Sequence, residues 1–115
     1  MVVDQLSDDE VDRIFGALAD ATRRDILARA IADGQSISTL AGRYAMSFAA
    51  VQKHVAVLER AALVTKERRG REQIVHANAT TLSKAAALLD AYEELWTERA
   101  RRIADVLAGE EGAPE

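Results

Sequence analysis

Basic side chains that can bind a polyanion are concentrated in the middle of this chain. Residues 38–71 contain seven Lys and Arg side chains and two acids, which gives a local net charge of +5. The bases are Arg43, Lys53, Arg60, Lys66, Arg68, Arg69 and Arg71. Because clustered cations bind phosphate oxygens, this segment predicts contact with nucleic acid although the whole chain carries −4.

An amphipathic helix is expected directly after Ser47, and the side chains on its polar face can contact DNA. The apolar stripe consists of Val51, Val55, Leu58 and Ala62. The side chains then left facing outward near the helix start are Phe48, Ala49, Gln52, Lys53 and Ala56. A helix fits the major groove, where Gln52 can pair with an adenine edge and Lys53 with guanine or phosphate.

The start of this helix offers two further contacts. Phe48 or Ala49 can contact a thymine methyl group. Ser47, at the helix N-terminus, is placed to hold a phosphate with its hydroxyl and its backbone amide.

A β-hairpin with a basic tip is predicted after the helix. Residues 63–68 and 72–77 are β-branched and partly alternating, and Arg69-Gly70-Arg71 lies between them. Lys66, Arg68, Arg69 and Arg71 are expected over the adjacent DNA backbone or minor groove. A basic turn is often only a solvated turn, so by itself it would not predict DNA contact. The helix pair that precedes the hairpin is what favours a DNA-binding role for it.

Composition excludes several other classes of protein. The chain has 115 residues, no cysteine and one proline, which suits one mainly helical domain without thiol chemistry. No apolar run has the roughly 20 residues of a membrane span, and the acidic N-terminus does not resemble a signal peptide. We therefore expect a cytoplasmic protein that does not bind a membrane.

Capping and periodicity signals place the elements that position these residues. The first helix is expected over about residues 7–18, with Ser7 as its cap, and the second from Asp20 to a stop at Asp33-Gly34. A short third helix follows Ser38, a fourth follows Ser47, and a long last helix runs from Thr80 to near Gly109. The predicted fold is mainly α with a small β-hairpin: one winged helix-turn-helix domain over residues 1–115, with about five helices and a two-stranded wing. The helix-turn-helix covers about residues 38–62 and the wing about 63–78, and the acidic tail 110–115 is expected to be disordered.

These motifs resemble the ArsR/SmtB family of bacterial winged-helix transcription regulators. The resemblance lies in ALADATRRDILARA and in ISTLAGRYAMSFAAVQKHVAVLERAALVTKERRGREQIVHAN, and it spans about residues 10–108. It implies a homodimer that presents two recognition helices and two wings to a palindromic operator. Such binding normally represses transcription, often of the regulator's own operon.

The family's contact positions can be carried over residue by residue. Ser47, Gln52, Lys53 and His54 fall on the recognition helix, and Arg68, Arg69 and Arg71 fall on the wing. Phe48 and Ala49 replace a common glutamine and proline, so base preference is not transferable. Ala21 replaces a common proline and Ala62 a common glycine, and both changes are expected to be tolerated.

The metal and thiol sensor sites of the family have no counterpart here. Leu40-Ala41-Gly42-Arg43 contains no cysteine, and the last helix contains no histidine. Its carboxylates (Asp90, Glu93, Glu94, Glu98 and Asp105) are expected to form a solvated face paired with Arg99, Arg101 and Arg102. His54 is expected in the core or on a phosphate, and His76 on the second strand. We therefore expect no metal, no cofactor and, without a nucleophile–base pair, no enzyme activity.

Dimerisation is predicted through the first and last helices, about residues 7–18 and 80–108. The expected interface residues are Val11, Ile14, Phe15, Leu89, Tyr92, Trp96 and Ile103. Trp96, Tyr92 and Phe15 could alternatively line a small-molecule pocket, but interface packing is favoured. No residue pattern identifies an effector.

The predicted function is sequence-specific DNA binding by a homodimeric transcriptional repressor that is autoregulatory and not metal-responsive. One alternative is a non-specific or RNA-binding winged helix, which would share the basic wing. The other is a protein-interaction module, which would not need seven bases in 34 residues.

Overall fold

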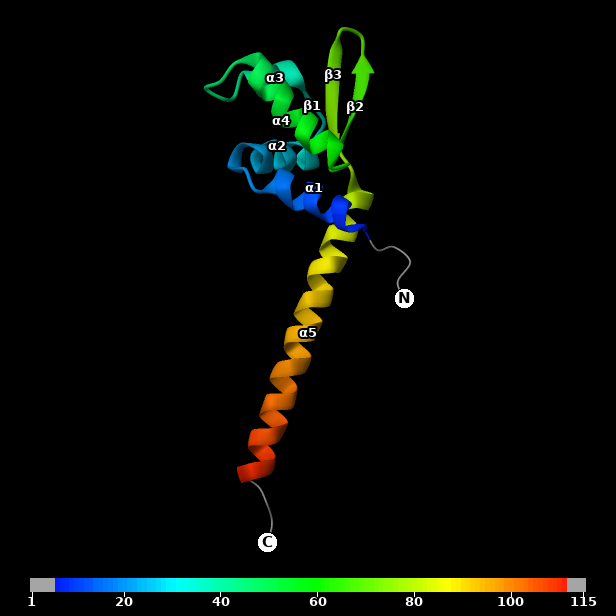
Figure 1. Cartoon of the computed structure of the whole chain (residues 1–115). Coiled ribbons are helices and arrows are strands. Elements are labelled where there is room, and N and C mark those ends of the chain that lie inside the picture. The colour runs from blue at the N-terminus through cyan, green and yellow to red at the C-terminus, as the bar shows by residue number, and fades with distance from the viewer. Residues whose placement is uncertain (1–5, 112–115) are drawn as a thin grey trace. The chain divides into compact units, whose positions relative to one another are not determined.

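The computed structural model describes residues 6–111, in which there are five α-helices and three β-strands (Figure 1). In chain order they are α1 (Asp8–Leu18), α2 (Ala21–Ala32), β1 (Gln35–Ser36), α3 (Ile37–Ala41), α4 (Phe48–Arg60), β2 (Val64–Arg69), β3 (Glu72–Ala77) and α5 (Ala79–Glu111). The predicted mainly helical fold with a small hairpin is confirmed. The chain divides between Ala85 and Ala86 into two compact units.

The predicted caps of the first two helices are present. The Ser7 hydroxyl accepts from the Glu10 amide (3.1 Å), and Glu10 accepts from the Ser7 amide (2.7 Å). That pair of bonds lowers the pKa of Glu10, with the bond from the Ser7 amide as the larger cause. Asp20 caps α2 by accepting from the Arg23 amide at 3.0 Å.

The third helix begins earlier than predicted, and a strand precedes it. Ser36, not Ser38, is its cap, and the Ser36 hydroxyl accepts from the Thr39 amide at 3.0 Å. The two-residue strand β1 pairs antiparallel with β3, at Gln35↔Val75 and Ser36↔Ile74. The sheet therefore has three strands in the order β1-β3-β2 rather than the two expected. A strand this short shows no alternation in the sequence.

The core of the first unit is built on the apolar stripe of α4. Val51, Val55 and Leu58 are each 0% exposed, as the periodicity predicted. The other fully buried large side chains are Ile14, Ile26, Leu40, Leu63, Val64 and Val75. Ala61 completes the stripe, whereas Ala62, which was assigned to it, is exposed and lies beyond the helix.

The turn after α4 requires an unusual backbone conformation at Ala62. The Leu63 amide donates to the Leu58 carbonyl (3.0 Å) and the Ala62 amide to the Glu59 carbonyl (2.9 Å). These two bonds form a Schellman motif, in which Leu58 and Leu63 are both buried. Ala62 has φ 60°, so the alanine expected to be tolerated here carries steric strain that glycine would avoid.

Ala62→Gly is therefore expected to stabilise the protein by about 1 kcal/mol, the left-handed penalty less the entropy cost of glycine. Chemical denaturation measures the change. Ala61→Gly is the matched control, because Ala61 has φ −82° and is buried, so the same substitution there should destabilise. A destabilised Ala62→Gly variant would contradict the strain.

The wing is a β-hairpin of two six-residue strands joined by a tight turn. β2 pairs with β3 from Val64↔Ala77 to Arg69↔Glu72. Gly70 has φ 65°, which glycine adopts without steric cost at this turn. Val64 and Val75 anchor the base of the hairpin in the core, and the hairpin projects from the helices of its unit (Figure 1).

The second unit consists of the greater part of α5. This helix has 33 residues and continues to Glu111, past the end predicted near Gly109, so Glu110 and Glu111 belong to the helix rather than to a tail. The rest of the predicted tail lies outside the described residues. Among residues 6–111, no helix is both long and apolar enough to cross a membrane.

Candidate DNA-binding surface

The outward face of α4 carries the side chains predicted to read bases. Ala49, Gln52 and Lys53 are exposed, and Phe48 is 47% exposed at the helix start. Ala56 is half-buried, so the available face is confined to the first half of the helix. Residues in this part of a recognition helix reach base edges in the major groove.

Ser47 both caps α4 and keeps a free donor. Its hydroxyl oxygen accepts from the Ala50 amide at 3.1 Å. A serine hydroxyl that accepts one bond still has its own proton to donate. The exposed Ser47 can therefore bind a phosphate oxygen without giving up its cap.

A hydrogen bond from Tyr44 holds the helix-turn-helix on α2, and Arg29 of the same helix supports its acceptor, Asp25. Tyr44, in the turn before α4, donates to Asp25 Oδ2 at 2.5 Å, and Arg29 Nε donates to the same oxygen at 2.9 Å. These bonds lower the pKa of Asp25, with the Tyr44 bond as the larger cause. Burial, followed by the bond to Asp25, raises the pKa of Tyr44. The turn is thus fixed to a neighbouring helix.

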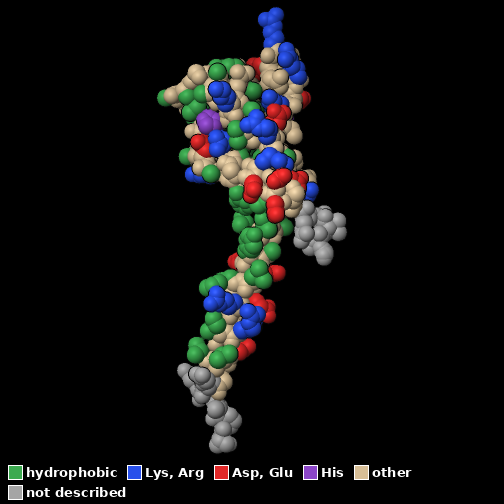
Figure 2. Space-filling model, viewed as in Figure 1, with side chains coloured by type: hydrophobic (Ala, Val, Ile, Leu, Met, Phe, Trp, Pro, Cys, Tyr) green, Lys and Arg blue, Asp and Glu red, His purple; other side chains and the backbone are tan. Residues whose placement is uncertain are grey.

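The four basic side chains predicted on the wing differ in whether a carboxylate lies beside them. Lys66 Nζ lies 3.3 Å from Glu59 Oε1, and Arg69 Nη2 lies 2.9 Å from Glu67 Oε1. Among the described residues, Arg68 and Arg71 have no carboxylate within 4 Å, and Arg68 Nε donates to the Gly70 carbonyl at 3.2 Å. Basic side chains gather on the hairpin (Figure 2). Arg68 and Arg71 thus have charges not offset by a partner.

Glu67 is the acidic residue on β2, and it is held by two neighbours. Its Oε1 accepts from Arg69 and lies 2.7 Å from His76 Nε2. The bond to His76, and then the charge of Arg69, lower the pKa of Glu67. His76 is half-exposed on β3, as predicted, and its ring lies against Gly34, where an added Cβ would be 2.9 Å from His76 Cε1.

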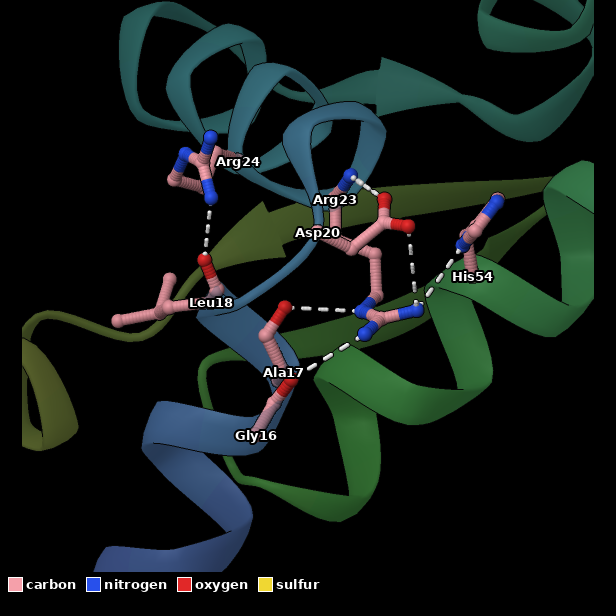
Figure 3. A network of polar contacts seen from close by, with 7 residues as sticks. All are labelled: Gly16, Ala17, Leu18, Asp20, Arg23, Arg24 and His54. Atoms are coloured by element: carbon pink, nitrogen blue, oxygen red, sulfur yellow. Dashed lines mark hydrogen bonds and ion pairs between the residues drawn. The ribbon is translucent and has the colours of Figure 1, made fainter.

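His54 contacts Arg23, a residue for which the sequence predicted no role. Arg23 Nη1 of α2 lies 3.3 Å from His54 Nδ1 of α4. The same guanidinium donates to the carbonyls of Ala17 (2.8 Å) and Gly16 (3.1 Å) at the end of α1 (Figure 3). The Asp20–Arg23 spacing is visible in the sequence, but the contact with α4 depends on how three helices pack.

The predicted interface residues are mostly accessible, with one correction. Ile14 is 1% exposed and belongs to the core of its own chain, so it is unavailable to a partner. Val11 and Phe15 are half-buried. The residues expected on α5 are exposed: Leu89 (52%), Tyr92 (59%), Trp96 (64%) and Ile103 (48%).

The charged face of α5 forms the expected ion pairs in part. Glu98 pairs with Arg101 (3.6 Å) and Arg102 (3.9 Å). Arg99 instead lies over the Trp96 ring, 5.9 Å from its centroid. Over residues 6–111 no three His, Cys, Asp or Glu side chains are grouped as metal ligands.

Comparisons with known proteins agree with this geometry. No family model and no curated protein matches the chain. An ArsR-like transcriptional regulator from Rhodococcus sp. RHA1 is 34% identical, with a TM-score of 0.75, over 85% of this chain and 92% of that one. Another ArsR family transcriptional regulator is 28% identical, with a TM-score of 0.75, over 81% and 96%.

A more distant neighbour shares the fold. It is a homodimeric winged helix-turn-helix DNA-binding domain from Mycobacterium bovis, described as a possible ArsR-family regulator. It is 22% identical with a TM-score of 0.61, over 82% of this chain and 92% of that one. With the winged helix-turn-helix in place and 34% identity over 92% of the Rhodococcus protein, the chain belongs to the ArsR family of transcriptional regulators.

Proposed function

We propose that this protein is a homodimeric, sequence-specific repressor that binds a palindromic operator, including that of its own operon. The observation that carries the proposal is the exposed polar face at the start of α4 beside a basic hairpin. In a winged helix-turn-helix these are the two parts that meet DNA.

The residues divide into those that position the protein and those that read bases. Ser47, Lys66, Arg68, Arg69 and Arg71 bind phosphates or the adjacent minor groove, and His54 binds a phosphate. Gln52 and Lys53 contact base edges, and Phe48 or Ala49 packs on a thymine methyl group. Because Lys66 and Arg69 already have carboxylate partners, Arg68 and Arg71 contribute most on the wing.

The dimer forms through α5, and Val11 and Phe15 of α1 also contact the partner. The exposed apolar residues of α5 recur at coiled-coil spacing, at Leu89, Tyr92, Trp96, Ile103 and Val106. An apolar stripe of this length is normally covered by a partner. The Mycobacterium bovis neighbour, described as homodimeric, supports a second copy as that partner.

The dimer does not respond to metal ions. The chain has no cysteine, and the described residues have no cluster of metal ligands. Equal operator affinity with and without added Zn²⁺ is the expected behaviour.

Enrichment of DNA from a random duplex pool by the purified protein tests the proposal. We expect an inverted repeat whose half-site centres lie about one helical turn apart, roughly 34–36 Å. A pool that remains random after several rounds, although the protein retains DNA, would favour the non-specific winged helix instead.

Gln52→Ala is expected to relax the preference at one base position in each half-site. A bidentate contact to adenine contributes about 1–3 kcal/mol of discrimination, so the preferred base should lose roughly 5- to 150-fold of its advantage. Competition with single-base operator variants measures this. Arg60→Ala is the control, because Arg60 is exposed at the far end of α4 and should leave every position unchanged. Unaltered discrimination in Gln52→Ala would remove Gln52 from base reading.

A further inference from the structure

Arg23 connects the end of α1 to the recognition helix. Its Nε donates to the Ala17 carbonyl and its Nη2 to the Gly16 carbonyl, both at the C-terminus of α1. Its Nη1 lies 3.3 Å from His54 Nδ1 and 3.9 Å from Asp20 Oδ2. The side chain is only 18% exposed, so this planar group is held by contacts in three directions (Figure 3).

The contact with His54 determines which ring nitrogen carries a proton. A guanidinium has five N–H donors and no acceptor, so His54 Nδ1 must accept and cannot hold a hydrogen. The proton of the neutral ring is then on Nε2. In Figure 3 the far side of the His54 ring points away from Arg23, so Nε2–H is directed away from the guanidinium.

His54 lies on α4 next to Lys53, and it is half-exposed. We propose that Arg23 is a positioning residue for DNA binding, which fixes the tautomer and direction of His54 so that Nε2–H donates to a DNA phosphate oxygen. The inference rests on the proposed function, since it assumes that α4 meets DNA. It adds a connection from α1, through Arg23, to a phosphate contact.

A phosphate is the partner that this donor fits. Phosphate oxygens only accept, and they occur at every step of the duplex whatever its sequence. His54 lies beside the buried stripe rather than at the exposed helix start, where base edges are reached. Loss of the His54 contact should therefore lower the affinity for the operator and for an unrelated duplex by the same factor.

Arg24 provides a matched control for Arg23. Arg24 Nη1 donates to the Leu18 carbonyl at 2.7 Å, so it binds the same end of α1. No bond joins Arg24 to α4 among the described residues (Figure 3). Arg23→Gln and Arg24→Gln remove the same charge and a similar helix-end contact, but only the first releases His54.

The test is a double-mutant cycle on duplex affinity at one salt concentration. Arg23→Gln is expected to weaken binding about fivefold more than Arg24→Gln, and this difference should vanish in a His54→Ala background. His54→Gln, whose amide can replace Nε2–H, should recover most of the loss caused by His54→Ala without needing Arg23. Equal effects of the two arginine variants, or a difference that persists without His54, would overturn the proposal.

A second measurement needs neither a variant nor DNA. The ¹⁵N–¹H spectrum of the imidazole distinguishes its protonated nitrogen, and we expect Nε2 protonated and Nδ1 bare in the wild-type protein. A proton on Nδ1 would overturn the proposal even if Arg23→Gln failed to fold. Wild-type protein that binds neither duplex would instead contradict the proposed function, a result distinct from DNA binding with no Arg23–His54 coupling.

Discussion

Replacement of Arg68 and Arg71 together by alanine is expected to weaken binding of the dimer to every duplex by about 100-fold or more at low salt. Each arginine has an unshared charge at the wing tip, and a charge-assisted phosphate contact contributes about 1.5–3 kcal/mol. Each phosphate contact also releases a counterion, and the homodimer loses four arginines, so the slope of log affinity against log salt should fall by about 4. Fluorescence anisotropy over a salt series measures both quantities.

The pattern of the loss is as informative as its size. The affinities for the operator and for a random duplex should fall by the same factor, because phosphate contacts do not depend on the base sequence. Arg101→Ala with Arg102→Ala is the control, since it removes two charges that pair with Glu98 on α5. An unchanged salt slope in the wing variant would mean that the hairpin does not contact DNA.

Trp96→Asp is expected to convert the dimer to a monomer and so to abolish operator binding at nanomolar protein. Trp96 is 64% exposed in the middle of the apolar stripe of α5. A carboxylate buried there without a partner costs several kcal/mol, which raises the dimer dissociation constant by about 100-fold or more. Sedimentation equilibrium at micromolar concentration measures the change.

Ala87→Asp introduces the same charge on the opposite face of α5, where Ala87 is exposed. It should leave both the dimer and the operator affinity unchanged. A Trp96→Asp variant that remains dimeric would place the interface elsewhere, and a wild-type monomer would refute the homodimer altogether.

Elements whose signal is local could be predicted from the sequence. Ser7, Asp20 and Ser47 cap their helices because the partner amide is three residues away, a spacing that the sequence displays directly. The stripe Val51, Val55 and Leu58 is buried because its period matches a helix. The outward face of α4 follows from the same period, which is why its exposed residues were identified.

Features that depend on distant segments could not be predicted. Ser36 rather than Ser38 caps α3 because Gln35 and Ser36 pair with β3, some forty residues further along the chain, with Gln35 opposite Val75. Periodicity showed that Ile14 lies on an apolar face, but not that its own chain covers it. The reach of Arg23 to His54 likewise depends on packing, since a long polar side chain leaves no periodic signal.

Ala62 is an intermediate case. The departure from the family's glycine was visible, but its cost became clear only from the positive φ and the two Schellman bonds. The strain lies between the recognition helix and the wing, the two elements that must be held in register on DNA.

The central claim is that this protein distinguishes one DNA sequence from others through α4. The most direct test is the ratio of its affinities for the enriched inverted repeat and for a shuffled duplex of the same composition, at physiological salt. Specific regulators bind their sites typically 10³- to 10⁷-fold more tightly, and we expect a ratio of about 10³ or more. Equal affinities would contradict the claim and leave only a non-specific, charge-driven DNA-binding protein.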